Sequence, residues 1–224
     1  MSIAIAIDGP AGAGKSTISK SAAKQLGFIY IDTGALYRTV GLAASRAGVE
    51  PVEGKEVDEL LSKIKVELTF NDKGEQVVLL DGEDVSGLIR TPEASMMASK
   101  ISAVPAVRAF LLDLQRDMAK KNNVIMDGRD IGTVVLKDAP VKIYMVASPE
   151  ARAQRRLLQN QKNGIEGDYE SILEDIKKRD YQDMHREVSP LKKAEDAIEI
   201  DTSYMSKEEV ADAVMKIVLE KTGD

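Results

Sequence analysis

A lysine and a hydroxyl follow a glycine-rich run near the beginning of the chain, in the pattern G-x-x-x-x-G-K-[ST]. The pattern comprises Gly9, Pro10, Ala11, Gly12, Ala13, Gly14, Lys15 and Ser16. Glycines let successive backbone N–H groups point inward and leave room for phosphate oxygens. The lysine can reach β- and γ-phosphates, and the serine hydroxyl can bind Mg²⁺. These residues therefore predict a loop that binds a nucleoside triphosphate.

A second candidate site follows the apolar segment 28–31 and consists of Asp32, Thr33, Gly34, Ala35, Leu36, Tyr37 and Arg38. A hydroxyl at a helix start, with Arg38 about one turn later, predicts an anion site. Ligands of open α/β sheets bind beyond the carboxyl ends of the strands, so this turn is expected to face the glycine loop. A plain helix cap with an exposed arginine is the alternative.

Asp127 ends the apolar segment 124–126, the position at which P-loop proteins carry an acidic residue near Mg²⁺. Arg129 and Asp130 follow in a loop that has Gly128 and Gly132 on either side. On a surface such neighbours would form an ion pair worth less than about 1 kcal/mol. Their place at the end of a strand favours a functional role.

Three arginines share one face of the helix that is expected to begin after residue 148, namely Arg152, Arg155 and Arg156. Like charges at this spacing repel one another unless an anion binds. Gly164 and Gly167 follow, and then a second helical segment, which is typical of a mobile lid. A solvated face paired with Glu174 or Asp175 is the alternative.

Arg179, Asp183 and Arg186 fall on one face of that second helix, at i, i+4 and i+7. Taken alone, this stripe predicts only a ladder of salt bridges. His185 lies outside the stripe and is expected to be a surface or packing residue.

The elements that must position these side chains alternate between short apolar segments and longer amphipathic ones. Strands are predicted at 3–7, 28–31, 124–126, 141–147 and 197–200, and helices lie between them. This pattern is typical of an α/β fold with parallel strands joined by helical crossovers. The segments 64–70 and 75–80 instead alternate around a turn at 71–74 and predict a β-hairpin, with a further turn at 81–84, in an inserted lobe near 64–90.

The composition excludes several classes of protein. The 224 residues contain no cysteine and one histidine, which excludes thiol catalysis, iron–sulfur clusters and histidine-based metal cages. The net charge of −6 argues against binding a nucleic-acid polymer or an anionic membrane. Because no leader or membrane-spanning segment is evident and cysteine is absent, we expect a cytoplasmic protein without a membrane partner.

Together these motifs resemble one family, the bacterial cytidylate kinases, which are the CMP/dCMP kinases of the nucleoside monophosphate (NMP) kinase group. The resemblance rests on segments 9–17, 32–38, 127–133, 179–186, 189–191 and 201–203, and so covers essentially the whole chain. The glycine loop is common to many proteins, whereas Asp-Gly-Arg-Asp-x-Gly-Thr with the late Arg/Asp stripe is highly specific.

The resemblance implies a P-loop NTPase core with a five-stranded parallel sheet flanked by helices, a small β insertion in the NMP-binding lobe, and a helical lid. One kinase domain would comprise a core at 1–33, 104–150 and 188–224, the NMP-binding lobe at 34–103 and the lid at 151–187. It also implies transfer of the γ-phosphoryl of ATP, with Mg²⁺, to CMP or dCMP. Nothing in the sequence demands more than a monomer.

The resemblance also implies roles for individual residues. The catalytic groups would be Lys15, Arg129, Arg155 and Arg156. ATP would bind to the loop residues 9–17, including Thr17, and to Arg152, while Ser16 and Asp127 would hold the metal ion. The acceptor would bind to Thr33, Tyr37, Arg38, Ser99, Arg108, Arg129, Asp130, Arg179, Asp183 and Arg186. Within this last set, Ser99, Arg108 and Asp130 would read the base.

The base assignment agrees with hydrogen-bonding chemistry. Asp130 can accept from the N4 amino group of cytosine, and Arg108 can donate to N3. Uracil reverses both groups, and each buried polar group left unpaired costs about 1–3 kcal/mol. UMP is therefore expected to be a poor substrate. Two other functions stay open at this point: a P-loop kinase for another small acceptor such as adenylate or uridylate, and a non-catalytic switch gated by nucleotide.

Overall fold

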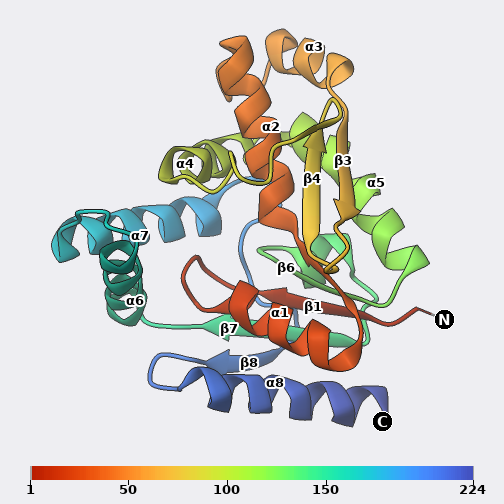
Figure 1. Cartoon of the computed structure of the whole chain (residues 1–224), viewed down its shortest axis with the longest axis vertical. Helices are drawn as coiled ribbons and strands as arrows, with labels where there is room; N and C mark the ends of the chain where they lie inside the picture. The colour runs from red at the N-terminus through yellow and green to blue at the C-terminus, as the bar shows by residue number, and fades with distance from the viewer. Residues whose placement is uncertain (1, 224) are drawn as a thin grey trace.

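A computed structural model of the chain describes residues 2–223 and contains a central sheet of five parallel strands (Figure 1). The strands lie in the order β2-β6-β1-β7-β8. Their bounds are β1 Ala4–Asp8, β2 Ile29–Asp32, β6 Val124–Gly128, β7 Val141–Val146 and β8 Ile198–Asp201. All neighbouring pairs run parallel, which confirms the predicted α/β fold with a parallel sheet.

Helices cover both faces of this sheet because its strands are apolar on both sides. In β1, Ile5 and Ile7 lie on one face of the sheet and pack against the helices α1 (Lys15–Leu26) and α8 (Lys207–Thr222). The alternate residue Ala6 packs on the other face, toward helix α5 (Pro105–Lys121) and a π-helical turn at Ile131–Val135. The strand ends therefore meet at one edge of a rigid, doubly covered sheet.

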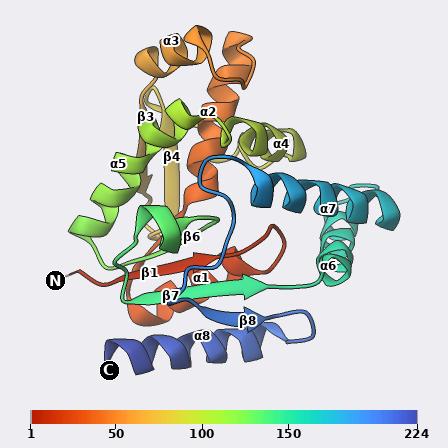
Figure 2. The same ribbon diagram turned by 180° about the vertical axis from the view of Figure 1, so that it is seen from behind.

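A second, antiparallel sheet stands beside the first (Figures 1 and 2). It contains β3 Val66–Phe70, β4 Gln76–Leu80 and β5 Glu83–Asp84. With α2 (Thr33–Ala47), α3 (Lys55–Lys63), α4 (Pro92–Ile101) and α5, it encloses a hydrophobic core of its own. The predicted hairpin is confirmed, and the segment expected to be only a further turn adds the short third strand.

The helices α6 (Pro149–Lys162) and α7 (Tyr169–His185) pack against each other and project from the carboxyl ends of the strands (Figure 2). Ser148 caps α6 by accepting a hydrogen bond from the Ala151 N–H, and Asp168 caps α7 through the Ser171 N–H. Most of their residues are exposed, so few contacts fix this helix pair to the core.

Among residues 2–223, no single helix is long and apolar enough to cross a membrane. By length and composition alone, Glu93–Ile101 and Pro105–Lys121 pass the test as a pair, with a bend of 100° between them.

Candidate active site

The glycine loop joins β1 to α1 and can be built only with glycine at its first position. Gly9 has a φ of 147°, and a Cβ there would lie 2.0 Å from the backbone oxygen of Met145 in β7. Inside the loop, the Lys15 ammonium donates to the carbonyl oxygen of Pro10 at 2.8 Å. Gly9 and Pro10 therefore shape the loop, whereas residues 12–18 line a cavity beside it.

Two cavities meet at this loop. Four residues line both of them: Gly12, Lys15, Ser16 and Arg156. One, of about 650 Å³, lies between the loop, α6 and the start of α8, and is called the donor cavity because the predicted triphosphate-binding residues line it. The other, of about 220 Å³, lies between the loop, α2, α4 and α7, and is called the acceptor cavity because the residues predicted for the acceptor line it. The arrangement offers a separate compartment on each side of Lys15, as two ligands that react with each other require.

The residues predicted from the sequence divide between these cavities. The donor cavity is lined by Gly12, Ala13, Gly14, Lys15, Ser16, Thr17, Arg152, Arg155 and Arg156. Ala11 lines the acceptor cavity, together with all ten residues predicted for the acceptor: Thr33, Tyr37, Arg38, Ser99, Arg108, Arg129, Asp130, Arg179, Asp183 and Arg186.

Burial perturbs the charged groups between the two cavities. The pKa of Lys15 is lowered to about 7, first by burial and then by the nearby Arg129 guanidinium. Burial and the neighbouring Asp32 raise the pKa of Asp127 to about 6. A lysine that lacks solvation in this way is stabilised in its charged form when phosphate oxygens surround it.

Asp127 lies beside the loop hydroxyl in an arrangement that suits a divalent cation. Ser16 donates from Oγ to one carboxylate oxygen of Asp127 at 2.6 Å, and Tyr30 donates from Oη to the other at 3.0 Å. Mg²⁺ is usually held by one or two protein oxygens together with the phosphates of a substrate. The donor set of Ser16 and Asp127 therefore fits Mg²⁺, with Tyr30 fixing the carboxylate.

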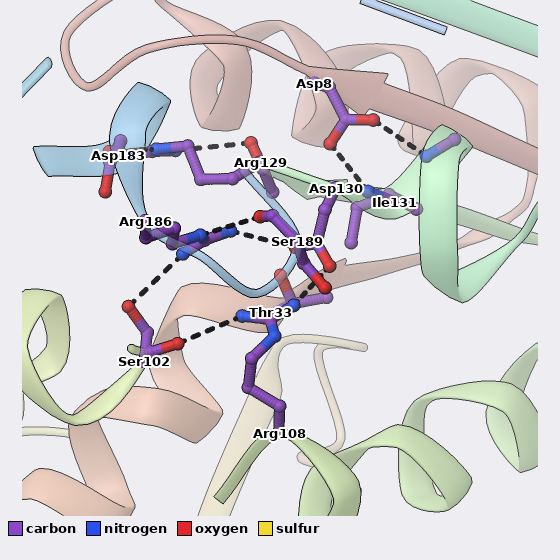
Figure 3. A network of polar contacts seen from close by, with 12 residues as sticks. Asp8, Thr33, Ser102, Arg108, Arg129, Asp130, Ile131, Asp183, Arg186 and Ser189 are labelled. Carbon is purple, nitrogen blue, oxygen red and sulfur yellow. Dashed lines mark hydrogen bonds and ion pairs between the residues drawn. The ribbon is translucent and has the colours of Figure 1, made fainter. Parts of the chain in front are cut away.

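Arginines gather around the middle of the acceptor cavity. Arg38 pairs with Asp32 at 2.7 Å. Arg129 pairs with Asp183 at 2.9 Å (Figure 3). The buried Nε atoms of Arg38 and Arg179 have no hydrogen-bond partner among residues 2–223. Burial and the Arg129 charge lower the pKa of Arg179 to about 10. Unpartnered buried donors and mutual repulsion both favour an anion at this point.

At the inner end of the acceptor cavity, two of the three predicted base readers, Arg108 and Asp130, contact each other, and the third, Ser99, lines the same cavity. Arg108 forms an ion pair with Asp130 and donates to the carbonyl oxygen of Ser102 at 3.2 Å (Figure 3). Arg186 lies 3.5 Å from the second Asp130 oxygen and donates to the Ser102 hydroxyl at 3.3 Å. The guanidinium carbon of Arg108 lies over the Tyr37 ring, 5.5 Å from its centroid.

The family profile described as cytidylate kinase matches residues 5–220 of this chain. The chain belongs to the cytidylate kinase family. The cytidylate kinase of Caldicellulosiruptor bescii is 51% identical over 96% of the chain and 95% of the relative, and that of Mycobacterium leprae is 48% identical over 99% and 97%. A solved structure of an uncharacterized protein from Eubacterium ventriosum shares the fold, with a TM-score of 0.53 at 14% identity over 98% of this chain and 99% of that one.

Several residues that shape this cytidylate kinase site were not singled out in the sequence. The buried Asp8 accepts from the N–H groups of Ile131 and Gly132, at 2.8 and 2.7 Å, and so fixes the turn that follows Asp130 (Figure 3). Ser102 accepts a hydrogen bond from Arg108 through its carbonyl oxygen and one from Arg186 through its hydroxyl. Asp8 and Ser102 each have partners that are remote in the sequence, at 123 and 124 residues for Asp8 and 84 residues for Ser102 with Arg186, which no local spacing reveals.

The structure gives the α6 arginines and Thr33 further partners. The alternative that paired the α6 arginines with Glu174 or Asp175 is wrong for Arg152, which pairs with Asp180, because that residue faces α6. Arg155 instead donates to the backbone oxygen and hydroxyl of Thr202. The Thr33 hydroxyl lines the acceptor cavity but donates to the Asp127 carbonyl oxygen at 2.8 Å, so it also has a structural partner.

Proposed function

We propose that this member of the cytidylate kinase family transfers the γ-phosphoryl group of ATP to CMP and dCMP with Mg²⁺. The observation that carries the proposal is the meeting of two compartments at Lys15 and Arg156, one beside the glycine loop and the other lined by arginines. A kinase needs this arrangement, because donor and acceptor phosphates must approach in line while their charges are neutralised.

In the donor compartment, the N–H groups of the glycine loop and the start of α1 hold the phosphates of ATP. Ser16 and Asp127 would hold Mg²⁺, which when bound neutralises charge on the β- and γ-phosphates. Arg155 and Arg156, which line the donor cavity, would add positive charge around the γ-phosphoryl group.

In the acceptor compartment, Arg38 and Arg129 would hold the CMP phosphate, and Arg179 and Asp183 the sugar and phosphate. A phosphate oxygen of CMP attacks the γ-phosphorus, and the bond from that phosphorus to the β,γ-bridging oxygen breaks. ADP leaves with the electron pair of that bond. No side-chain nucleophile is needed, so the protein contributes position and positive charge.

Base selection would depend on the paired readers. Asp130 accepts from the N4 amino group of cytosine, and Arg108 donates to N3. Because Asp130 already binds two guanidinium groups, it is held as an acceptor, and the oxygen at position 4 of uracil would meet it unfavourably. This chemistry supports CMP over uridylate as the acceptor.

Residues 34–103 would form the NMP-binding lobe, 151–187 the lid, and the rest of 1–224 the core. Closure of α6 and α7 over the loop would exclude water and limit hydrolysis of ATP. We further propose a cytoplasmic monomer without a nucleic-acid polymer or membrane partner, which the net charge of −6 and the lack of cysteine support.

The test is release of ADP from ATP·Mg²⁺ in parallel reactions with CMP, dCMP, UMP, AMP or no acceptor. Turnover is expected with CMP and dCMP and near-background rates with the others. Equal turnover with UMP would refute the base assignment but retain a kinase. ATP binding without any acceptor-dependent turnover would favour a nucleotide-gated switch.

A further inference from the structure

Arg152 lies at the base of α6 and joins three parts of the chain. Its side chain is 3% exposed. Nε donates to the carbonyl oxygen of Ala147, between β7 and α6, at 2.9 Å. Nη1 donates to the carbonyl oxygen of Ala11 in the phosphate loop at 3.1 Å. Nη1 and Nη2 also donate to the two carboxylate oxygens of Asp180 in α7, at 2.9 and 2.5 Å.

These contacts occupy all three nitrogens of the Arg152 guanidinium. A bidentate carboxylate already neutralises its charge, so it has little left to offer a phosphate. Arg38 and Arg179 differ, because within the part of the chain that the structure describes their buried Nε atoms have no hydrogen-bond partner. Although Arg152 borders the donor cavity, its geometry is that of a bridge rather than a ligand.

The two ends of the bridge belong to different compartments. Asp180 lies on α7 next to Arg179 and three residues before Asp183, both of which line the acceptor cavity. At the other end, a Cβ built on Gly12 would lie 3.3 Å from Cβ of Arg152, so the phosphate loop packs on the stem of this arginine. A displacement of α7 is therefore transmitted directly to the loop.

We propose that Arg152 and Asp180 are positioning residues that couple the acceptor compartment to the phosphate loop, so that ATP and CMP each tighten the binding of the other. This inference rests on the proposed function, because it assigns CMP to α7 and ATP to the loop. Thermodynamic linkage requires the factor to be the same in both directions.

Calorimetric titration of CMP with and without the non-hydrolysable analogue AMP-PNP·Mg²⁺ gives this coupling factor. For the unaltered chain we expect a factor of about 5–150. Arg152→Lys keeps the charge but has one nitrogen for three partners, and Asp180→Asn keeps the shape but loses the charge. Both are expected to bring the factor close to one, while the Kd for AMP-PNP alone changes less than about threefold.

Direct binding of ATP by Arg152 would give a different pattern. Arg152→Lys would then weaken AMP-PNP alone, whereas Asp180→Asn, by freeing the guanidinium, would leave it unchanged or tighten it. That result would overturn the proposal. So would a factor near one in the unaltered chain, or one that survives either substitution.

Loss of one member of a buried ion pair can destabilise a fold, so two further variants are needed. Arg152→Gln with Asp180→Asn removes both charges and is expected to lose coupling to the same extent as either single variant. Asp196→Asn breaks another pair with a buried cation, Lys142, at 2.8 Å and is expected to retain the full factor. If CMP fails to bind even the unaltered chain, the proposed function is refuted and the coupling with it.

Discussion

Asp130 carries two cations at the inner end of the acceptor cavity, and its carboxylate is almost inaccessible to solvent. Arg108 contacts one oxygen, and Arg186 lies 3.5 Å from the other. A carboxylate accepts hydrogen bonds and does not donate them, which in the proposed base assignment is the property that distinguishes cytosine from uracil. In that assignment, selectivity depends on one charge and on the pair that orients it.

Asp130→Asn is expected to lower kcat/KM for CMP by about 10- to 100-fold, because one buried charge-assisted hydrogen bond is lost. The preference for CMP over UMP is expected to fall as well, since an amide can donate to the O4 of uracil. The measurement is kcat/KM for both acceptors. Asp117→Asn, which removes an exposed carboxylate paired with Lys120, serves as the control. An unchanged CMP/UMP ratio in Asp130→Asn would contradict the assignment.

Residue types and spacing were sufficient to predict the loop lysine, the loop hydroxyl and a role for Arg38 and Arg129, whereas Ser99 and Arg108 followed only from the family resemblance. Types and spacing were not sufficient for Asp8, Ser102 or Asp180. Asp8 follows an apolar strand like any strand-terminal acid, and its partners are 123 and 124 residues away. The pairing of Asp180 with Arg152 depends on the packing of α6 against α7, which is not encoded in local spacing.

At the scale of elements, β1 supports the segment that carries Asp130. That segment continues into the π-helical turn Ile131–Val135, in which the Val135 and Leu136 N–H groups donate to oxygens five residues earlier. Asp8 binds two N–H groups at the start of the turn, and Arg116 from α5 donates to the carbonyl oxygens of Val134 and Val135 near its end. The turn is thus held at both ends.

The pKa of Asp8 is raised from 3.8 to about 6, chiefly by burial, and this predicts a pH-dependent stability. Because the unfolded chain releases this proton more readily, the Asp8 contribution to stability is greatest below about pH 4 and declines as the pH rises through 6. The free energy of unfolding of the unaltered chain minus that of Asp8→Asn is expected to fall by roughly 2–3 kcal/mol between pH 4 and pH 7.

Urea denaturation of both proteins across this pH range is the measurement. The control is Asp168→Asn. Hydrogen bonds from Ser171 lower the pKa of the exposed Asp168 carboxyl. The free energy of unfolding of the unaltered chain minus that of Asp168→Asn is therefore expected to rise with pH, opposite to the difference for Asp8→Asn. A difference for Asp8→Asn that rises with pH would contradict the predicted burial effect.

The sequence predicted the long elements better than the short ones. All five strands of the parallel sheet and the helix Pro105–Lys121 follow from apolar periodicity. Helix α3 was not predicted, because it has only nine residues and buries only Val57 and Leu60, so its apolar stripe is short. The two-residue strand β5 depends on a turn in which Asp81 and Gly82 both have positive φ, and on pairing with β4.

At the scale of the molecule, a side chain of the antiparallel sheet makes hydrogen bonds to the parallel sheet. Gln76 at the start of β4 accepts from the Asp32 N–H at 2.7 Å and donates to the Asp32 carbonyl oxygen at 3.2 Å. Asp32 ends the edge strand β2, and its carboxylate binds Arg38 at 2.7 Å and caps α2 through the Ala35 N–H. The amide thus continues the hydrogen bonding of the parallel sheet into the inserted lobe.

Gln76→Leu removes both hydrogen bonds and preserves the size of the side chain. Because each bond contributes roughly 0.5–1.5 kcal/mol, the substitution is expected to raise KM for CMP about tenfold. KM for ATP is expected to stay nearly constant, because Asp32 positions the acceptor arginine and not the phosphate loop. Steady-state kinetics with each substrate varied in turn is the measurement, and Gln25→Leu on the exposed side of α1 is the matched control. Equal increases in both KM values would mean that the amide supports the fold as a whole, and an unchanged KM for CMP would mean that the two sheets hold the acceptor site without it.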